Sequence, residues 1–555
     1  MDIKQQLIAA IGQAATKAVA DGVFVAERLP EIALEVPPQK EFGDYATNFA
    51  MQSAKAAKMN PRVIAQAIID RLDEPWLDKA LLAGPGFINF YLKSDILYQD
   101  LADILAAGEN FGQTNAGQGQ RVQVEFVSAN PTGPLHVGHG RGAAVGSALV
   151  NLLRVAGYQV EAEYYINDAG NQMDNLAASV NARYLEIMGK SVDFPEDGYH
   201  GKDIIDTAER IIDKHGDKYL SMPEAERLAA FKEVGLKEKL AALKEDLEQF
   251  GVNFDVWFSE RTLHNSGSVA ATCELLQANG NIYEKDGALW LKSTAYGDDK
   301  DRVVIRDNGV PTYLAADIAY HRDKFARGFN KVINIWGADH HGYICRVKAA
   351  INAMGYNADN LEVMILQMVS LYQDGQLVKM SKRTGQGVTL SELIEEVGRD
   401  AARYFFIMRS TDSQLDFDLD LAKSHSNENP VYYIQYAHAR ISSIFRQVAD
   451  AGLPVHAAWD QIKLELLTEQ AEIDLIKKMA MFPEEVASAA YERAPHRIAR
   501  YAHELASLFH TFYNQCRIIG VEPDLQAARL ALVTAVRATV KQSLGILGVA
   551  APDKM

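Results

Sequence analysis

The 555-residue sequence predicts an α/β protein built around a doubly wound parallel sheet, with an α+β domain before it and an α-helical bundle after it. In the middle of the chain, β-favouring runs alternate with helical patterns, as at 121–127, 135–156 and 157–168. A helix between two strands of one sheet requires a right-handed crossover and makes the strands parallel. Beyond about Asn427 the helical patterns continue without strands, and the length is too great for one core.

Composition limits the class of protein. Hydrophobic residues make up 48% and charged residues 23%, as in ordinary globular domains. No apolar run approaches the ~18–20 residues of a membrane span, and the amphipathic N-terminus lacks the layout of a signal peptide. Three scattered cysteines indicate neither a disulfide framework nor a zinc knuckle, so we expect a reducing compartment. The net charge of −17 argues against non-specific nucleic-acid coating but leaves room for a shaped RNA bound by local basic patches.

Residues 1 to about 95 form the first predicted domain. An opening helix precedes a strand at 32–36 that is bounded by prolines, and two helical stretches follow. A short strand after the Gly84-Pro85-Gly86 turn completes this part. A helix from Tyr98 and a glycine-rich linker then lead to the central domain.

The central domain opens with a strand, a tight turn and a helix. Val122, Val124 and Phe126 mark a buried strand, Pro131 and Pro134 then prevent regular structure, and helical spacing follows. A helix start above a strand points free backbone N–H groups, and roughly half a positive charge, at any ligand there. Ligands of such sheets bind at the carboxyl ends of the strands.

The first helical turn carries His136 and His139, which lie on one face, with Gly138 and Gly140 beside them. Three interpretations are open on these residues alone. They are surface histidines, zinc ligands, or donors to a phosphate group. Zinc would need a third ligand and favours an H-E-x-x-H spacing, which is absent.

A long charged helical stretch occupies residues from about 170 to 250, and we expect a solvated insertion without chemistry of its own. Strands and helices then resume, in 254–262, 287–293, 302–325 and 331–355, as the second half of the same fold. The run LVKMSKRTGQG follows at 377–387, where two lysines flank a short turn. By itself this run predicts only an exposed basic loop.

Together, HVGH and KMSK, about 240 residues apart, resemble the HIGH and KMSKS signatures of class I aminoacyl-tRNA synthetases. The run HVGHGR is similar to the form found in the arginyl-tRNA synthetase family, and the resemblance spans essentially the whole chain. Arg383 replaces the final serine of KMSKS, a departure that leaves both lysines intact.

The resemblance implies three domains. These are an N-terminal tRNA-binding α+β domain (1–95), a class I, Rossmann-like catalytic domain (118–425, with a helical insertion at about 170–250), and a C-terminal helical anticodon-binding domain (427–555). The implied reaction attaches L-arginine to its tRNA with ATP, through an arginyl-adenylate, and releases AMP and pyrophosphate. The alternatives are a class I synthetase for another amino acid, a small nucleotidylyltransferase, and an inactive tRNA-binding paralogue.

The chain shows no nucleophile–base motif, which fits a reaction whose nucleophile is the carboxylate of the amino acid. The protein then needs to position the reactants and neutralise developing charge. The resemblance implies His136, His139, Lys379 and Lys382 as catalytic residues, and it implies ATP binding by His136, Gly138, His139, Met380, Ser381 and Lys382. We expect Mg²⁺ to arrive with ATP, and we expect no bound zinc, no other metal site and no permanent cofactor.

Arginine recognition requires carboxylates in forked geometry, because a guanidinium offers parallel N–H donors. Tyr313 and Asp317 are four residues apart and share a face if a helix begins there. The family positions imply arginine binding by Glu125, Ser128, Asn130, His139, Glu260, Tyr313, Asp317 and His340.

In the family the helical tail reads the anticodon with aromatic and arginine side chains, which stack and pair with splayed bases. The tRNA-binding candidates are Tyr432, Tyr436, Arg440, Asn514 and Arg517. The expected partners are tRNA(Arg), L-arginine and ATP, with no DNA and no membrane. We expect a cytoplasmic monomer whose amino-acid activation, as in the family, requires bound tRNA.

Overall fold

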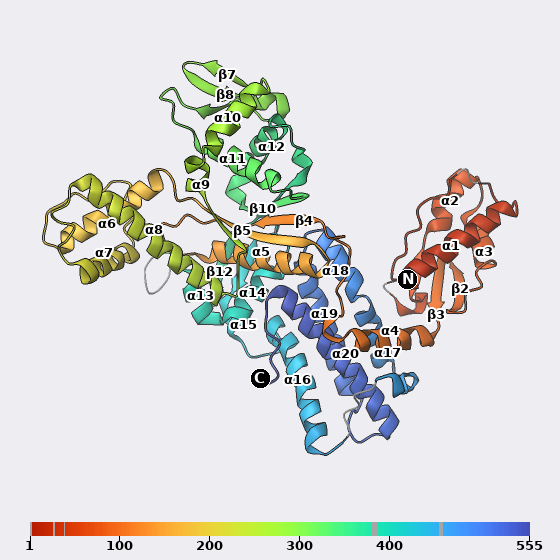
Figure 1. The fold of residues 1–555 in the computed structure, drawn as a ribbon. Helices are drawn as coiled ribbons and strands as arrows, with labels where there is room; N and C mark the ends of the chain where they lie inside the picture. Colours follow the sequence, from red (N-terminus) through yellow and green to blue (C-terminus); the bar gives the residue numbers. More distant parts are fainter. Residues whose placement is uncertain (1–2, 26–27, 38, 380–386, 454–458) are drawn as a thin grey trace. The chain divides into compact units, whose positions relative to one another are not determined.

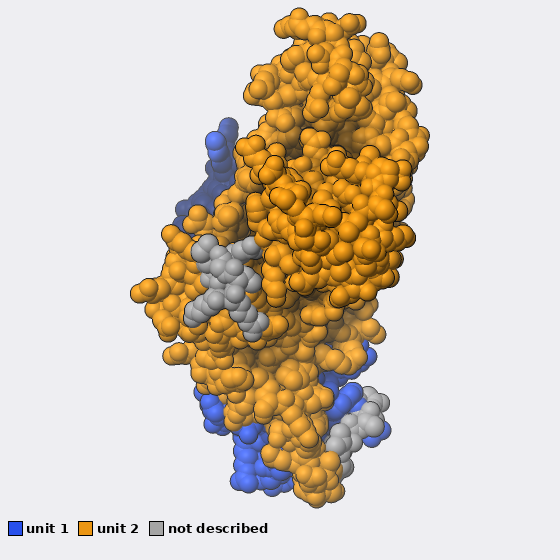
Figure 2. Space-filling view, turned by 90° about the vertical axis from the view of Figure 1, so that its left-hand side faces the viewer, with its two compact units in different colours: residues 1–107, 455–480, 512–535 blue, residues 108–454, 481–511, 536–555 orange. Residues whose placement is uncertain are grey.

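The computed structural model describes residues 3–25, 28–37, 39–379, 387–453 and 459–555. The chain divides into two compact units, which are coloured separately in Figure 2. Unit 1 comprises residues 1–107, 455–480 and 512–535, and unit 2 comprises residues 108–454, 481–511 and 536–555. The residues of α19 (His496–Gln515) and α20 (Pro523–Leu547) are divided between the two units.

Unit 1 contains a three-stranded antiparallel sheet in the order β1-β3-β2, packed against α1, α2 and α3. Apolar residues of both layers, such as Leu7, Ile11, Ile64 and Phe90, form its core. The elements are α1 (Ile3–Ala20), β1 (Tyr45–Thr47), α2 (Phe49–Ala57), α3 (Pro61–Ile69), β2 (Leu77–Ala83), β3 (Phe87–Leu92), α4 (Ser94–Ala107) and α17 (Gln470–Ala480).

The strand predicted at residues 32–36 is wrong. Only Glu35 pairs, in an isolated antiparallel bridge with Ala46. Pro30 and Pro37 flank the segment, and a proline has no N–H to donate to a ladder, so the pairing does not extend.

Unit 2 is built on a five-stranded sheet whose order is β11-β10-β4-β5-β6 and whose neighbours are all parallel. This arrangement confirms the predicted doubly wound parallel sheet. The order reverses between β4 and β10, which makes that position the topological switch point. The strands are β4 (Arg121–Glu125), β5 (Gln159–Ile166), β6 (Val256–Ser259), β10 (Lys331–Gly337) and β11 (Leu361–Leu366).

Helix α5 (Val137–Val155) follows β4 and is buried along most of its length, because small residues let it pack closely on its neighbours. A Cβ added at Gly146 would lie 2.3 Å from the Phe126 ring, and one at Gly140 would lie 2.8 Å from Leu390 Cδ1. These two positions therefore require glycine.

Two segments interrupt the parallel sheet (Figure 1). Helices α6 (Asn171–Ile187), α7 (Lys202–His215) and α8 (Glu224–Gln249) pack on one another around their own core, which includes Leu176, Tyr184 and Phe231. Strands β7 (Ile282–Lys285), β8 (Ala288–Leu291) and β9 (Arg302–Ile305) form a separate antiparallel sheet. The sequence places the runs 287–293 and 302–325 in the second half of the main fold, whereas their strands, β8 and β9, pair with β7 in this separate sheet.

The elements around the second segment share one core with β10 and β11. Helix α11 (Tyr313–Ala326) and helix α12 (Ile344–Ala353) contribute most of that core, together with α10 (Ser268–Ala278). The short helix α9 (Glu260–Asn265) directly follows β6.

The last part of unit 2 is mainly helical, which agrees with the predicted helical bundle. A small sheet in the order β13-β12-β14 precedes it. The elements of the small sheet and of the helical part are β12 (Val369–Gln373), β13 (Gln376–Val378), α13 (Leu390–Val397), α14 (Arg399–Ile407), β14 (Leu415–Asp418), α15 (Leu419–Lys423), α16 (Pro430–Asp450), α18 (Phe482–Tyr491) and parts of α19 and α20.

The fully buried Arg403 holds the end of α20 onto the fold of the parallel sheet. Its guanidinium donates to the carbonyl of Leu547 at 3.0 Å, to the carbonyl of Phe250 at 3.0 Å and to the Ser147 hydroxyl at 2.7 Å. Helix α20, the one described helix that is long and apolar enough to cross a membrane, has 67% of its apolar window buried inside the protein. That burial is typical of a core helix of a folded protein.

Candidate active site

The carboxyl edge of the parallel sheet gathers most of the predicted site residues. Glu125 ends β4, and Ser128, Asn130, His136 and His139 follow it. Glu260 follows β6 directly, and His340 follows β10 within the 3₁₀ helix η4 (Ala338–Tyr343). The edge includes the switch point between β4 and β10, where a cleft for ligands is expected.

The HVGH turn forms the N-terminus of α5 through a pair of reciprocal hydrogen bonds. His136 Nδ1 accepts from the backbone N–H of Gly138 at 3.1 Å, and His139 Nδ1 accepts from the backbone N–H of His136 at 3.3 Å. The two rings stack with their centroids 3.7 Å apart. Since both Nδ1 atoms accept, the ring proton of each neutral imidazole is on Nε2, where it can be donated to a ligand.

Both histidines favour the neutral form. Desolvation lowers the pKa of His136. Burial, and then the neighbouring His136, lower the pKa of His139 to about 4. At neutral pH the turn therefore offers two uncharged N–H donors at a helix N-terminus, which is a suitable arrangement for phosphate oxygens.

The backbone of the HVGH turn pairs with the segment that follows the KMSK run. Leu390 N donates to Leu135 O at 2.8 Å, Val137 N donates to Val388 O at 3.3 Å, and His136 forms an antiparallel bridge with Thr389. Thr389 then caps α13 by a reciprocal pair of hydrogen bonds with Glu392. Lys379 is exposed at the end of β13, whereas the predicted residues Met380, Ser381 and Lys382 lie outside the described residues.

The loop after β4 has a strained backbone. Val127 has φ 67° and Ser128 has φ 41°, and a positive φ is rare for a β-branched residue. This bend lets the Ser128 hydroxyl donate to Glu125 Oε1 at 2.9 Å and accept from the backbone N–H of Tyr165 at 3.1 Å. Strain of this kind costs about 1–3 kcal/mol and often marks a functional site.

Helix α11 begins at Tyr313, so Tyr313 and Asp317 do lie one helical turn apart. Tyr313 is 54% exposed and lines a cavity of about 320 Å³, together with Glu260, His264, Arg306 and Gly170. Asp317 Oδ2 is buried and has no donor in hydrogen-bonding geometry among the described residues, although the Tyr343 hydroxyl interacts with the same carboxylate. A buried carboxylate oxygen without a donor is costly unless a ligand supplies one.

Glu260 is 4% exposed, and burial raises the pKa of its carboxyl group. With the Asn167 amide turned so that both its oxygen and its nitrogen find partners, Nδ2 donates to Glu260 Oε2 at 3.0 Å. His264 Nε2 lies 3.3 Å from Glu260 Oε1. Asp168 fixes the start of α9, because its carboxylate accepts from the Ser259 hydroxyl at 2.6 Å and from the Arg261 backbone N–H at 3.1 Å.

The charges of three predicted acids act on Tyr165. Burial raises the pKa of Tyr165 strongly, and the charges of Glu260, Asp317 and Glu125 raise it further. Burial, and then Asp317, also raise the pKa of Tyr343. The structure thus brings together carboxylates from β4, α9 and α11 in one place, which suits a ligand with more than one positive charge. His340, by contrast, is 60% exposed and pairs with Asp339 at 3.5 Å.

Among the described residues, no group of three or more His, Cys, Asp or Glu side chains could hold a metal ion. Arg141, the arginine of HVGHGR, is fully buried and donates to the carbonyls of Gln367, Ser410 and Ser413 at 2.7–3.0 Å. This arginine ties α5 to two loops and does not face the candidate site as a free cation.

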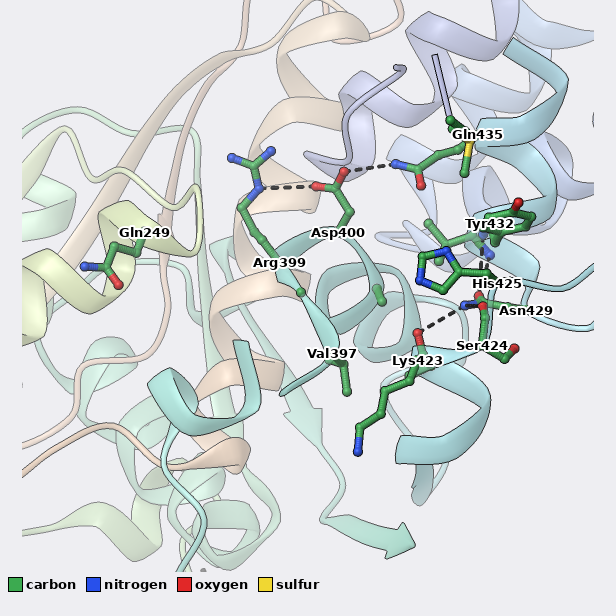
Figure 3. Close-up of a pocket in the computed structure, with 15 residues that line it drawn as sticks. Gln249, Val397, Arg399, Asp400, Lys423, Ser424, His425, Asn429, Tyr432 and Gln435 are labelled. Carbon is green, nitrogen blue, oxygen red and sulfur yellow. Dashed lines mark hydrogen bonds and ion pairs between the residues drawn. The ribbon is translucent and has the colours of Figure 1, made fainter. Parts of the chain in front are cut away.

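The candidate tRNA-binding residues on α16 form a ladder. The rings of Tyr432 and Tyr436 are stacked with centroids 6.1 Å apart, and the Arg440 guanidinium lies 4.9 Å from the Tyr436 ring centre. Tyr432 also lines a cavity of about 520 Å³ beside His425 and Arg399 (Figure 3). Asn514 and Arg517 are exposed and belong to unit 1.

Sequence reasoning missed several polar residues beneath the site, namely Tyr165, His321, Lys324, Asn334 and Tyr343. Two signals could have identified some of them. Residues 313, 317, 321 and 324 recur at helical spacing on one face of α11. Asn334 interrupts an otherwise apolar strand, where a polar side chain needs a partner.

Comparisons with known proteins cover the whole chain. Residues 2–92 match the family model of the arginyl tRNA synthetase N terminal domain, residues 100–423 that of the tRNA synthetases class I (R) catalytic domain, and residues 434–555 that of the DALR anticodon binding domain. An arginine–tRNA ligase of Carboxydothermus hydrogenoformans is 54% identical over 554 residues, covering 100% of this chain and 99% of the relative.

Solved structures agree with this result. A Campylobacter jejuni structure assigned as an arginyl-tRNA synthetase aligns with a TM-score of 0.77 at 38% identity, covering 84% of this chain and 100% of that one. The Thermus thermophilus arginyl-tRNA synthetase aligns with a TM-score of 0.75 at 24% identity, over 99% of this chain and 100% of that one. The second likeness supports the fold.

Proposed function

Because the chain belongs to the arginyl-tRNA synthetase family, and so attaches arginine to tRNA with ATP, we propose that the carboxyl edge of its parallel sheet is where arginine is activated and transferred. The observation that carries this proposal is that Glu125 and Glu260 stand at the carboxyl ends of β4 and β6, at the same edge as the HVGH helix terminus, with Glu260 and Tyr313 lining one cavity. The comparisons favour arginine over another amino acid as the substrate. They do not favour the nucleotidylyltransferase, which would need no helical tail.

Arginine carries a positive charge at each end, and the proposed site has acids for both. Asp317 and Glu260 bind the guanidinium, with Tyr313 at the mouth of the cavity. Glu125 and Ser128 bind the α-ammonium group. Asn130 and His139 hold the α-carboxylate, and the exposed His340 closes the outer side.

ATP lies against the N-terminus of α5. The Nε2–H groups of His136 and His139 and the backbone at Gly138 contact the phosphates and the adenosine side. Lys379, with Met380, Ser381 and Lys382 of the KMSK run, binds the phosphates that depart. Mg²⁺ enters as part of the ATP substrate complex.

The reaction then proceeds in two steps. A carboxylate oxygen of arginine attacks the α-phosphorus of ATP, the bond to the bridging oxygen breaks, and pyrophosphate leaves with its charge stabilised by the two lysines. A ribose hydroxyl at the tRNA 3′ end next attacks the carbonyl carbon of the adenylate. Its proton passes to the phosphate of the departing AMP as the bond between the carbonyl carbon and the phosphate oxygen breaks. The neutral histidines donate hydrogen bonds throughout and exchange no proton with either nucleophile.

The remaining parts of the chain bind tRNA. We propose that residues 1–95 contact the tRNA body and that residues 427–555 read the anticodon, with Tyr432, Tyr436, Arg440, Asn514 and Arg517 among the contacts. The enzyme acts as a cytoplasmic monomer without DNA or membrane partners.

The test is Asp317→Asn, assayed by aminoacylation. Removing one charge of the fork should raise the arginine KM by the equivalent of about 2–5 kcal/mol, while the ATP KM changes little. Asp299→Asn is the matched control, since the Asp299 side chain is 75% exposed and pairs only at the surface. A near-normal arginine KM in Asp317→Asn would mean that the guanidinium binds elsewhere.

A further inference from the structure

A hydrogen-bonded network of buried polar side chains lies beneath the proposed arginine site, and the mechanism above does not use it. Lys324 is fully buried on α11, and its ammonium group donates to Glu125 Oε2 and, at 2.9 Å, to Asn334 Oδ1. The same ammonium lies 4.3 Å from the centre of the Tyr320 ring. A buried cation needs partners of this kind to remain charged.

The sheet register explains how one lysine reaches both partners. Asn334 of β10 is the direct neighbour of Glu125 of β4 in the parallel ladder, so the two side chains project from the same face. Both lie at the switch point, beneath α11. Lys324 thus joins the two central strands on the face that carries the site.

The hydrogen bonds of this buried network can run in only one direction. Lys324 can only donate, so Asn334 Oδ1 must accept and Asn334 Nδ2 must point the other way, toward His321 Nε2 at 3.0 Å. His321 Nε2 then accepts, and His321 Nδ1 carries the ring proton. That proton faces two oxygens of Asp317, the carbonyl at 2.8 Å and Oδ1 at 3.3 Å.

The two ends of the buried network are Glu125 and Asp317, which are two of the proposed arginine ligands. Glu125 accepts from Lys324 at one end. At the other end the backbone carbonyl of Asp317 accepts from His321, with the carboxylate Oδ1 of Asp317 3.3 Å from the same ring nitrogen. His321 and Asn334 are 1% and 0% exposed, so solvent cannot replace these bonds. The His321 ring thus lies against Oδ1 of Asp317, and Oδ2 is the oxygen without a bonded donor.

We propose that Lys324, Asn334 and His321 are positioning residues that hold Glu125 and Asp317 at a fixed separation. The distance between the two carboxylates then matches the distance between the α-ammonium and the guanidinium of arginine. This inference rests on the proposed roles of Glu125 and Asp317. None of the three residues touches substrate. They act by fixing the positions of the Glu125 and Asp317 carboxylates.

Asn334→Asp tests the direction of the hydrogen bonds in this network, because the aspartate side chain has almost the same shape as asparagine. An aspartate offers His321 only acceptors, so the neutral ring must move its proton from Nδ1 to Nε2 and can no longer donate to Asp317. We expect the arginine KM to rise about tenfold to a hundredfold, the range for leaving one buried group unpaired, with the ATP KM unchanged. His321→Leu should act similarly, whereas His321→Gln, which retains one donor and one acceptor, should recover part of the loss.

Two further measurements separate positioning from a general loss of structure. Gln123→Leu is the matched control, because Gln123 is a fully buried amide on β4 whose side-chain atoms have no partner among the described residues. It should leave both KM values unchanged. In a double-mutant cycle, His321→Leu should add little to the arginine KM of Asp317→Asn, since both act on the same carboxylate.

Additive effects in that cycle, an unchanged arginine KM in Asn334→Asp, or an equal rise in the ATP KM would overturn the positioning role. Normal arginine KM values in both Glu125→Gln and Asp317→Asn would instead show that the site itself is wrongly assigned, and the positioning role would fall with it. Thermal unfolding of each variant identifies any that is not folded, and His321→Gln provides the conservative replacement for that comparison.

Discussion

His136 and His139 stack face to face at 3.7 Å while each ring accepts a backbone N–H at Nδ1. This relationship fixes the tautomer of both rings and turns their Nε2–H groups outward. It also disfavours protonation, because a proton on either Nδ1 would break a bond that caps α5. The signature therefore serves as a helix cap and as a pair of neutral donors.

A pH dependence of stability follows from the lowered pKa of His139, which falls from 6.5 to about 4 in the folded protein. Above pH 6.5 neither state binds the proton. As the pH falls from 6.5 toward 4, the unfolded chain binds a proton that the folded chain does not, so the folded state loses stability. His139→Asn, which keeps an acceptor for the His136 N–H, should lose less stability than the native chain between pH 7.5 and 5. Thermal unfolding across this range measures the difference, and parallel curves would contradict it.

Lys382→Ala should lower kcat by about a hundredfold or more with little change in the arginine KM. The lysine charge acts on the departing pyrophosphate, an interaction that is strongest in the transition state. Single-turnover adenylate formation measures this, and Lys237→Ala, at an exposed position of α8, is the control. A variant whose only defect is a raised arginine KM would remove Lys382 from this role.

Gly146→Ala should destabilise the protein, although alanine is the better helix former. The new Cβ would meet the Phe126 ring at 2.3 Å, and overpacking of this kind costs about 1–3 kcal/mol. Gly142→Ala in the same helix is the control, because the nearest atom to its new Cβ, Leu366 Cδ2, would be 3.8 Å away. That variant should be neutral or gain up to about 1 kcal/mol. Equal thermal stabilities of the two variants would argue against the close packing of α5 on β4.

ATP–pyrophosphate exchange with arginine should be negligible without tRNA and should appear when tRNA(Arg) is added. The physical reason is that tRNA binding energy completes the catalytic geometry. The intact chain is needed for this measurement. Removing the residues after Asn427 would delete the Leu547 carbonyl that buried Arg403 requires, so a truncated chain would lose core structure as well as tRNA contacts. Robust exchange by the enzyme alone would contradict the requirement for tRNA.

The sequence by itself determined the class of fold and the position of the nucleotide turn. Strand, helix and break patterns are local, so β4, α5 and β5 could be read from periodicity, prolines and glycines. HVGH and KMSK form a pair through their resemblance to the two class I signatures. The prediction that Tyr313 and Asp317 share a helical face required only the start of α11.

Only the tertiary structure decided which distant residues meet. The strands at 282–305 look like others in the sequence, but their antiparallel pairing places them in a separate sheet. The strand expected at 32–36 was limited to one bridge, because pairing depends on a partner and not on the segment alone. Glu125 and Lys324 are 199 positions apart, and their contact follows from the parallel register of β4 with β10 and from the packing of α11 above it. Because these side chains are buried, the contact and the hydrogen bonds that continue from Lys324 through Asn334 to His321 must form. A charge or amide that solvent does not reach needs a partner within the fold.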